Sequence, residues 1–177
     1  MSAGPVVFLT GAPGVGKSTV GRMLADRFER AFFLDLDAFR TLVVKGLSQP
    51  SAGWSEETTR QFDLAHRAAG QIASLYSEAG FAVVVAHCSN PEMVALFLEA
   101  CPHARVVCLR AELDVNVSRN NTRTHKSFDP RDIEFFVHDL WESLPARFER
   151  AGFLVLDTTR QTPEQSVEKV LGGGGFR

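Results

Sequence analysis

The sequence predicts a single α/β domain in which a parallel β-sheet is covered by helices. The length of 177 residues suits one domain spanning 1–177. Five short runs are almost continuously apolar, which is typical of strands buried on both faces: 5–10, 31–34, 81–86, 104–109 and 152–156. Segments with helical periodicity separate these runs, and this alternation favours parallel strands.

The first two predicted helices are recognised by the spacing of their apolar residues. A helix over 18–28 is expected because Val20, Leu24 and Phe28 recur every four residues. A longer helix is expected after Ser55, a residue type that caps helices well. Its apolar residues lie three or four positions apart and define one buried face: Phe62, Ala65, Ala69, Ile72 and Tyr76.

Two further helices are predicted from capping residues followed by proline. Asn90 and Pro91 open one of them, because proline is favoured at the first helical position, and Pro102 stops it. Asp129 and Pro130 open the other, whose buried face is Ile133, Phe136, Leu140 and Leu144. Pro145 is expected to end or kink that helix, since proline cannot donate a backbone hydrogen bond.

Two segments lack periodicity and are predicted to be loops. Residues 46–54 are rich in turn-forming types, and residues 119–128 are polar and basic. Binding and catalytic residues are often carried on loops, so the region 119–128 is a candidate mobile lid. Residues 172–177 contain a run of glycine and are expected to form a flexible tail.

Composition and charge exclude several classes of protein. A hydrophobic fraction of 45% and a charged fraction of 23% indicate an ordinary globular chain. The net charge of −2 lacks the basic excess of duplex-binding proteins, so nucleic acid is not an expected partner. No membrane span or secretory leader is evident, which predicts a cytoplasmic protein. Cys88, Cys101 and Cys108 lack C-x-x-C spacing and are expected to be reduced thiols.

The first predicted strand runs directly into a phosphate-binding motif. The segment Gly11-Ala12-Pro13-Gly14-Val15-Gly16-Lys17-Ser18-Thr19 matches G-x-x-x-x-G-K-[ST], between a strand and a helix as the motif requires. Glycines let backbone N–H groups approach phosphate oxygens, and the helix adds its positive dipole end. We expect a nucleoside triphosphate to be bound by Gly11, Gly14, Val15, Gly16, Lys17, Ser18 and Thr19. Lys17 would contact the β- and γ-phosphates, and Ser18 would be a ligand of Mg²⁺.

Other features of the chain argue against two classes of nucleotide-binding protein. A GTPase would need an N-K-x-D segment to bind its base, and Asn120-Asn121-Thr122-Arg123 does not provide one. A motor or transport ATPase would usually carry an acid at the end of a central strand. Here the third predicted strand leads into Ala86-His87-Cys88, and the fourth ends at Leu109-Arg110. Both classes are therefore disfavoured.

Two acidic residues lie on the second predicted strand instead. Residues two apart on a strand point the same way, so Asp35 and Asp37 are expected to share one face at the C-terminal end of the strand, at the sheet edge where the phosphate loop also lies. One acid would then serve the Mg²⁺ shell and the other an acceptor hydroxyl. The alternative for either residue is that it only caps the next helix, because aspartate is a good N-cap.

Together these segments resemble the shikimate kinase and gluconate kinase group of small P-loop kinases. Chloramphenicol phosphotransferase-like enzymes are similar at the same level. The resemblance rests on the phosphate loop, on 20–25, on Leu34-Asp35-Leu36-Asp37, on the stretch from 106–109 to Arg119, and on 156–163. It implies a five-stranded parallel sheet in the order 2-3-1-4-5, with ATP and Mg²⁺ bound.

The same resemblance implies roles for individual residues. It assigns to Asp37 the acid that orients or deprotonates the acceptor hydroxyl, and to Asp35 the acid near Mg²⁺. Arg119 falls where an arginine packs against the adenine, and Arg123 where a lid arginine closes on the phosphates. Residues 159–163 fall where a loop borders the adenine.

The chain departs from these families where their substrates bind. Shikimate kinases have three glycines after the third strand, and this chain has His87-Cys88-Ser89-Asn90. Their substrate arginine has no clear counterpart, although Arg60 and Arg67 lie in the corresponding region. The lid pattern of gluconate kinases is also missing. Neither substrate is therefore carried over to this chain.

Several other residues are candidates, each with a plain structural alternative. His87 could contact the acceptor, or could simply be hydrogen-bonded at the end of its strand. Arg60, His66 and Arg67 lie on the helix after Ser55, where at most one or two can face inward and the others are solvated.

The two predicted loops supply further candidates. Arg123 and Lys126 suit a lid that excludes water from phosphoryl transfer, although an ordinary exposed loop would look the same. Phe39 and Trp54 could line an acceptor pocket or pack in the core.

These observations predict an ATP-dependent phosphotransferase that moves the γ-phosphoryl group to a hydroxyl of a small molecule. The acceptor would be a metabolite, a sugar or an antibiotic, and the protein a monomer or homodimer. Lys17, Asp37 and Arg123 are the expected catalytic residues. Two alternatives stay open: a nucleoside or nucleotide kinase, and a non-catalytic ATP-binding regulatory module.

Overall fold

A computed structural model describes residues 2–50, 53–121 and 134–172 of the chain. Most of the predicted lid, including Arg123 and Lys126, lies outside these ranges, as do the helix start at Asp129 and Pro130 and most of the predicted tail.

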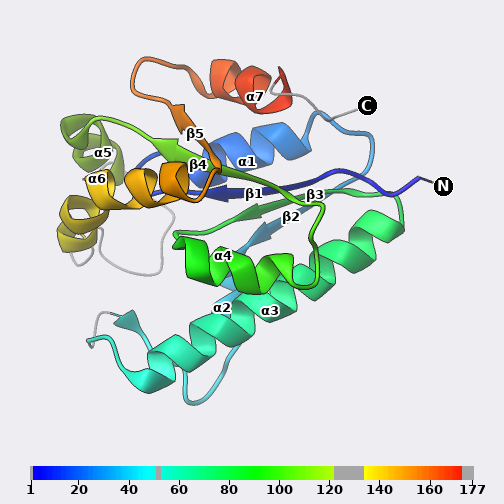
Figure 1. The fold of residues 1–177 in the computed structure, drawn as a ribbon, viewed down its shortest axis with the longest axis horizontal. Coiled ribbons are helices and arrows are strands. Elements are labelled where there is room, and N and C mark those ends of the chain that lie inside the picture. The colour runs from blue at the N-terminus through cyan, green and yellow to red at the C-terminus, as the bar shows by residue number, and fades with distance from the viewer. Residues whose placement is uncertain (1, 51–52, 122–133, 173–177) are drawn as a thin grey trace.

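Five parallel strands form the centre of the molecule (Figure 1). They lie in the order β2-β3-β1-β4-β5, which confirms the predicted sheet. Their bounds are β1 Val6–Thr10, β2 Ala31–Asp35, β3 Ala82–Ala86, β4 Arg105–Arg110 and β5 Leu154–Asp157. Every residue of β1 and β3 is buried, as their apolar sequences require.

The two outer strands differ from the prediction that every strand is buried on both faces. In β2 only Leu34 is fully buried, and in β5 only Leu156. Both strands lie at an edge of the sheet, where a neighbour is missing on one side and helices cover less of the surface.

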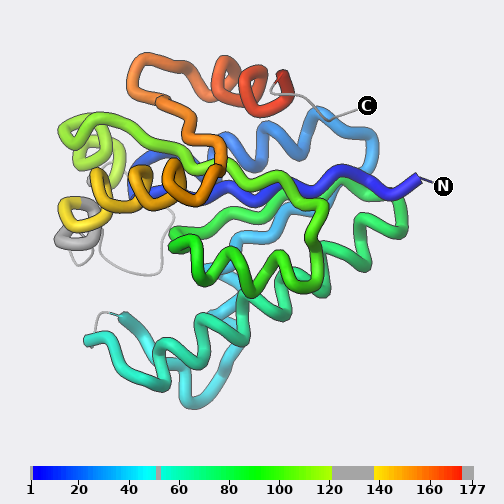
Figure 2. The backbone as a smooth tube through the Cα atoms, viewed as in Figure 1, coloured from blue at the N-terminus to red at the C-terminus, as the bar shows by residue number. Residues whose placement is uncertain are grey.

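Helices cover both faces of the sheet and form a three-layer sandwich. Their bounds are α1 Lys17–Ala25, α2 Leu36–Arg40, α3 Glu56–Glu78, α4 Pro91–Leu98, α5 Leu113–Asn121, α6 Glu134–Arg150 and α7 Pro163–Gly172. In the backbone trace of Figure 2, α1 and α7 lie above the sheet, and α3 and α4 lie below it.

Each face of the sheet has its own apolar core. Leu24 of α1 and Val170 of α7 pack against alternate sheet residues such as Leu9. Phe97 of α4 packs against the opposite set, which includes Phe8. Successive side chains of β1 therefore point into different cores. A strand covered on both faces needs apolar residues at every position, which explains the continuous apolar sequence.

Several predicted helix boundaries are confirmed and others are wrong. Ser55 and Asn90 cap α3 and α4 as expected, the first through a full capping box. The helix α6 continues through Pro145 to Arg150, because buried residues on both sides of the proline hold it in place: Leu144 and Phe148.

Two further boundaries, the start of the predicted loop 119–128 and the start of the predicted tail 172–177, differ from the structure. The helix α5 extends to Asn121, so the first three residues of the predicted loop 119–128 are helical. Gly172, the first residue of the predicted tail, is the last residue of α7.

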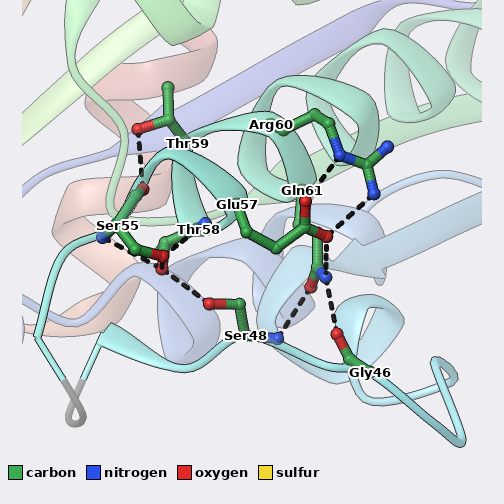
Figure 3. A network of polar contacts seen from close by, with 8 residues as sticks. All are labelled: Gly46, Ser48, Ser55, Glu57, Thr58, Thr59, Arg60 and Gln61. Carbon is green, nitrogen blue, oxygen red and sulfur yellow. Dashed lines mark hydrogen bonds and ion pairs between the residues drawn. The ribbon is translucent and has the colours of Figure 1, made fainter.

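In the predicted loop 46–54, of which residues 51–52 lie outside the described ranges, residues 46–48 are held against the first turns of α3 (Figure 3). The Gln61 side chain donates to the Gly46 carbonyl at 2.7 Å and accepts from the Ser48 N–H at 2.9 Å. The Ser48 hydroxyl lies 2.7 Å from that of Thr58. These contacts fix the first part of the connection between α2 and α3 on the N-terminal end of α3.

The three cysteines are free thiols, as predicted, and Cys101 and Cys108 are buried. Within the described ranges, no helix has the length and apolarity needed to cross a membrane.

Candidate active site

The phosphate loop lies between β1 and α1, where the motif predicts it. Gly11, Gly14 and Gly16 have φ of +135°, +92° and +99°, a region that side-chain-bearing residues rarely adopt. Gly16 is the N-cap of α1, with no side-chain cap and no acidic residue in the first turn. The beginning of α1 therefore presents its backbone donors and its positive dipole end, and its own first turn carries no acidic residue to neutralise them.

Lys17 is folded back over this loop. Its ammonium group donates to the carbonyl oxygens of Gly11 and Ala12, at 2.8 and 3.0 Å, and only 6% of the residue is exposed. A buried cation, a helix N-terminus and a glycine-rich loop at one place fit the phosphates of a nucleotide.

The residues present also fit Mg²⁺ held together with a nucleotide. The described part of the chain has no group of three His, Cys, Asp or Glu side chains that would hold a metal ion by itself. Mg²⁺ at such sites takes most of its ligands from water and phosphate and needs only one or two protein oxygens. The Ser18 hydroxyl, in the first turn of α1, is of the required type.

Asp35 and Asp37 do not lie on one strand, so the expectation that they share a strand face is wrong. The strand β2 ends at Asp35, and Asp37 is in the first turn of α2. The Asp35 carboxylate accepts from the backbone N–H groups of Asp37 and Ala38, at 3.1 and 3.4 Å. Asp35 is therefore the N-cap of α2, and the strand breaks because the cap competes for these N–H groups.

The side chain of Asp37 contacts that of His87. A carboxylate oxygen of Asp37 is 3.3 Å from His87 Nε2, with 41% of the Asp37 side chain exposed and 2% of the His87 side chain. His87 Nδ1 is 2.8 Å from the Ser89 hydroxyl. The ring of His87 is buried and contacts Asp37 and Ser89. This favours the alternative in which His87 is a hydrogen-bonded residue at the end of its strand and does not contact the acceptor.

Hydrogen bonds tie this acid–histidine pair to the phosphate loop. Thr10, the last residue of β1, donates its hydroxyl to the Ser89 carbonyl at 2.8 Å and accepts from the Ser89 N–H at 3.0 Å. The His87 N–H donates to the Leu9 carbonyl at 3.1 Å. Asp37 is thus linked through two residues, His87 and Ser89, to Thr10, the position that precedes Gly11.

Of the three candidate residues on α3, two are solvated and one faces inward, which agrees with the expectation that at most one or two would do so. Arg60 and Arg67 are exposed and form ion pairs with Glu57 and Glu99. His66 is fully buried and faces the sheet.

The two aromatic candidates have different environments. Phe39 is partly buried and packs against the core. Trp54 is 53% exposed, and its ring stacks on Phe62 with centroids 5.1 Å apart. Of these two aromatic residues, Trp54 is the one exposed at the surface.

Arg40 is a residue of this region that the sequence interpretation missed. Its guanidinium stacks on the Phe62 ring at 3.6 Å and donates to the Ser48 carbonyl at 2.8 Å. Burial lowers the pKa of Arg40, and the Asp37 charge opposes this shift. Its position three residues after Asp37 is the one feature of the sequence that could have identified it.

Arg119 connects α5 to the segment after β5. Its guanidinium donates to the Thr158 hydroxyl and carbonyl, at 3.3 and 3.2 Å. The Thr158 hydroxyl in turn lies 3.3 Å from the Val15 carbonyl of the phosphate loop. A cavity of about 630 Å³ borders the same segment and is lined in part by Asp157, Thr159, Arg160 and Gln161. The adenine contacts implied for Arg119 and 159–163 stay a prediction.

Comparison with known structures shows the fold. Over 96% of its length, the chain is similar to 93% of a sugar kinase from Janibacter sp. HTCC2649, with 20% identity and a TM-score of 0.67. It is also similar to a gluconokinase from Sinorhizobium meliloti 1021, with 16% identity and a TM-score of 0.64 over 98% of this chain and 93% of the gluconokinase. A shikimate kinase from Acinetobacter baumannii in complex with shikimate matches with 20% identity and a TM-score of 0.64, over 95% of this chain and 91% of the kinase. The predicted P-loop kinase fold is thus confirmed, and members of the suspected kinase group are among the structures that the chain resembles.

A search of curated proteins finds no match. A family model described as an AAA domain matches residues 6–151, which include the phosphate loop, Asp37 and His87. The chain therefore belongs to this AAA-domain family.

Proposed function

We propose that this protein is an ATP-dependent kinase that transfers the γ-phosphoryl group to a hydroxyl of a small molecule. The observation that carries the proposal is the link between the phosphate loop and a half-exposed carboxylate. Asp37 is connected through His87, Ser89 and Thr10 to the loop, so direct contacts join the acid to the phosphate cradle. A protein that only binds ATP gains nothing from a negative charge held there.

The cradle residues would bind and orient the phosphates. Lys17 would exchange its carbonyl partners for β- and γ-phosphate oxygens, and the N–H groups at the start of α1 would face the same anion. Ser18, with Asp35, would hold Mg²⁺, which supplies charge neutralisation on the phosphates when bound. Arg119 would border the adenine, and Arg123 would close over the transferred group.

Asp37 would hold the acceptor hydroxyl in line with the γ-phosphorus. The acceptor oxygen forms a bond to phosphorus while the bond to the β–γ bridging oxygen breaks, and ADP leaves. The hydroxyl proton passes to the Asp37 carboxylate. Positioning and electrostatics contribute most of the catalysis in such transfers, and these residues supply both.

The test is ADP release from Mg-ATP across a panel of hydroxyl acceptors. Sugars, sugar acids, nucleosides, nucleotides, aminoglycosides and phenicols cover the acceptor classes that the resemblance leaves open. Stimulation by one class is expected, and Asp37→Asn should lower that rate by about 10²- to 10⁴-fold, the usual contribution of a general base.

The matched control is Asp26→Asn. Asp26 is an exposed aspartate at the opposite end of α1, so its loss should leave the stimulated rate unchanged. An undiminished rate in Asp37→Asn would reject Asp37 as the base. ATP binding without stimulation by any acceptor would favour the regulatory module instead.

A further inference from the structure

The Thr158 side chain lies at a junction between the phosphate loop, β4 and α5. Thr158 directly follows β5 and is 2% exposed. Its hydroxyl donates to the Val15 carbonyl at 3.3 Å and is 3.0 Å from the Arg110 carbonyl at the end of β4. Arg119 of α5 donates to the same hydroxyl at 3.3 Å and to the Thr158 carbonyl at 3.2 Å. One buried hydroxyl therefore contacts all three segments.

The single proton of this hydroxyl is needed most at Val15. Arg119 donates to the hydroxyl oxygen, so the hydroxyl proton points away from Arg119 and toward the two carbonyls. The Arg110 carbonyl already accepts from the Thr158 N–H at 2.8 Å. The Val15 carbonyl has no other donor among the residues that the structure describes, and Val15 is 1% exposed. Because a buried carbonyl without a donor is destabilising, the bond from Thr158 to Val15 is the one that the fold requires.

This bond sets the orientation of the peptide between Val15 and Gly16. The Val15 carbonyl and the Gly16 N–H belong to one trans peptide, so they point in opposite directions. With the oxygen held by Thr158, the Gly16 N–H points away from Thr158. Gly16 is half-buried, and nothing in the described ranges accepts from its N–H. This donor is therefore available, at the N-cap of α1, for a phosphate oxygen.

We propose that Thr158 is a positioning residue whose hydroxyl holds the Val15–Gly16 peptide in the orientation that donates to phosphate. The inference rests on the nucleotide binding proposed above for the phosphate loop. Without the hydroxyl, rotation of this peptide turns the Val15 oxygen, with its partial negative charge, toward the bound anion and removes one N–H from the cradle.

Two variants of Thr158 separate the hydroxyl from the shape of the side chain. Thr158→Val removes the hydroxyl at nearly constant shape, and Thr158→Ser keeps it. The probe is inorganic tripolyphosphate, titrated into the full chain by calorimetry, because it needs neither a base nor an acceptor. Its Kd should rise about tenfold in Thr158→Val, the loss expected for one hydrogen bond, and change less than about twofold in Thr158→Ser. An unchanged Kd in Thr158→Val would overturn the proposal.

Ser77→Ala is the matched control for the loss of a buried hydroxyl. The Ser77 hydroxyl donates to the Gly4 carbonyl at 2.6 Å, and Ser77 is fully buried. Gly4 precedes β1, whereas the phosphate loop follows it, so this contact lies at the opposite end of the strand. Ser77→Ala should lower stability and leave the Kd of tripolyphosphate unchanged. An equal rise of the Kd in Ser77→Ala and Thr158→Val would assign the effect to general destabilisation and reject the positioning role.

The orientation of the peptide can be observed by NMR of protein labelled with 1-¹³C-valine and ¹⁵N-glycine. The sequence contains two Val–Gly pairs, Val15–Gly16 and Val20–Gly21, so a carbonyl–amide correlation spectrum contains two signals. Val20–Gly21 lies within α1 and reports whether the fold is intact. In Thr158→Val the Val15 carbonyl signal should move upfield, because the carbon loses the deshielding that a hydrogen bond causes, while the Val20 signal stays in place. An unmoved Val15 signal would show that Thr158 does not hold this peptide.

The same spectrum of the wild-type chain provides a test that needs no variant. On addition of tripolyphosphate, the Gly16 amide proton should move downfield as it donates to the anion, and the Gly21 amide proton should move much less. A Gly16 signal that does not respond to bound tripolyphosphate would overturn the proposal.

These measurements are independent of phosphoryl transfer. If tripolyphosphate binds but no acceptor stimulates ADP release, the kinase proposal fails, and the Kd values and the Gly16 signal still decide the role of Thr158. If an acceptor does stimulate ADP release and the Kd is the same in Thr158→Val and the wild type, the positioning proposal alone fails.

Discussion

At Gly14 the phosphate loop has no room for a side chain. A Cβ placed there would lie 2.3 Å from the backbone oxygen of Asn116, and φ is +92°. Gly14→Ala should therefore lower the free energy of unfolding by about 2–4 kcal/mol, from backbone strain and displacement of α5. Urea denaturation of the variant and the wild type measures this loss.

Gly152→Ala is the matched control for Gly14→Ala. Gly152 also has a positive φ, +79°, but no atom lies within 4 Å of a Cβ placed there. Only the conformational cost of about 1–2 kcal/mol should remain. Equal losses in the two variants would show that contact with α5 does not restrict the phosphate loop.

At the scale of an element, the short helix α2 positions Asp37 and depends on its cap. Asp35→Ala removes the acceptor of two N–H groups and should cost about 1 kcal/mol of stability. Asp35→Asn should cost much less, because asparagine caps helices equally well. Thermal or urea unfolding of the two variants separates the cap from the charge.

The same pair of variants tests the role proposed for Asp35 at Mg²⁺. Asp35→Asn keeps the cap and loses the charge, so half-maximal activity should require more Mg²⁺ than in the wild type. A Mg²⁺ requirement identical to that of the wild type would make Asp35 a cap and nothing more.

At the scale of the whole molecule, the buried His66 makes stability depend on pH. Burial lowers its pKa to about 3 in the folded protein, whereas an unfolded histidine binds a proton near its ordinary pKa of about 6.5. The unfolded state therefore takes up more protons between these values, and stability is lost as the pH falls through this window. Above about 6.5 His66 is neutral in both states and contributes no pH dependence.

The expected slope is up to about 1.4 kcal/mol per pH unit from His66 alone. Urea denaturation between pH 6.5 and 5 avoids most of the carboxylate titrations, and His66→Gln should be less pH-dependent than the wild type by this amount. His103→Gln, which removes an exposed histidine, should keep the wild-type slope. A wild-type slope retained in His66→Gln would contradict the assignment.

The fold class and the position of the phosphate loop between β1 and α1 could be predicted from the sequence. Both depend on local patterns. Glycines and Lys17 occur in a fixed spacing between a strand and a helix, and continuous apolar runs alternate with amphipathic segments. The sheet order came from the family resemblance, since periodicity does not specify which strands are neighbours.

The positions of the two acidic residues, Asp35 and Asp37, became clear only in the tertiary structure. A cap at Asp35 ends β2 one residue after Leu34 and moves Asp37 into a helix, a competition that strand periodicity cannot anticipate. The contact between Asp37 and His87 joins residues fifty positions apart. The buried His66 is in turn hydrogen-bonded to the Phe62 carbonyl in α3. The burial of His87 likewise depends on how the elements pack together, which is not visible before the chain has folded.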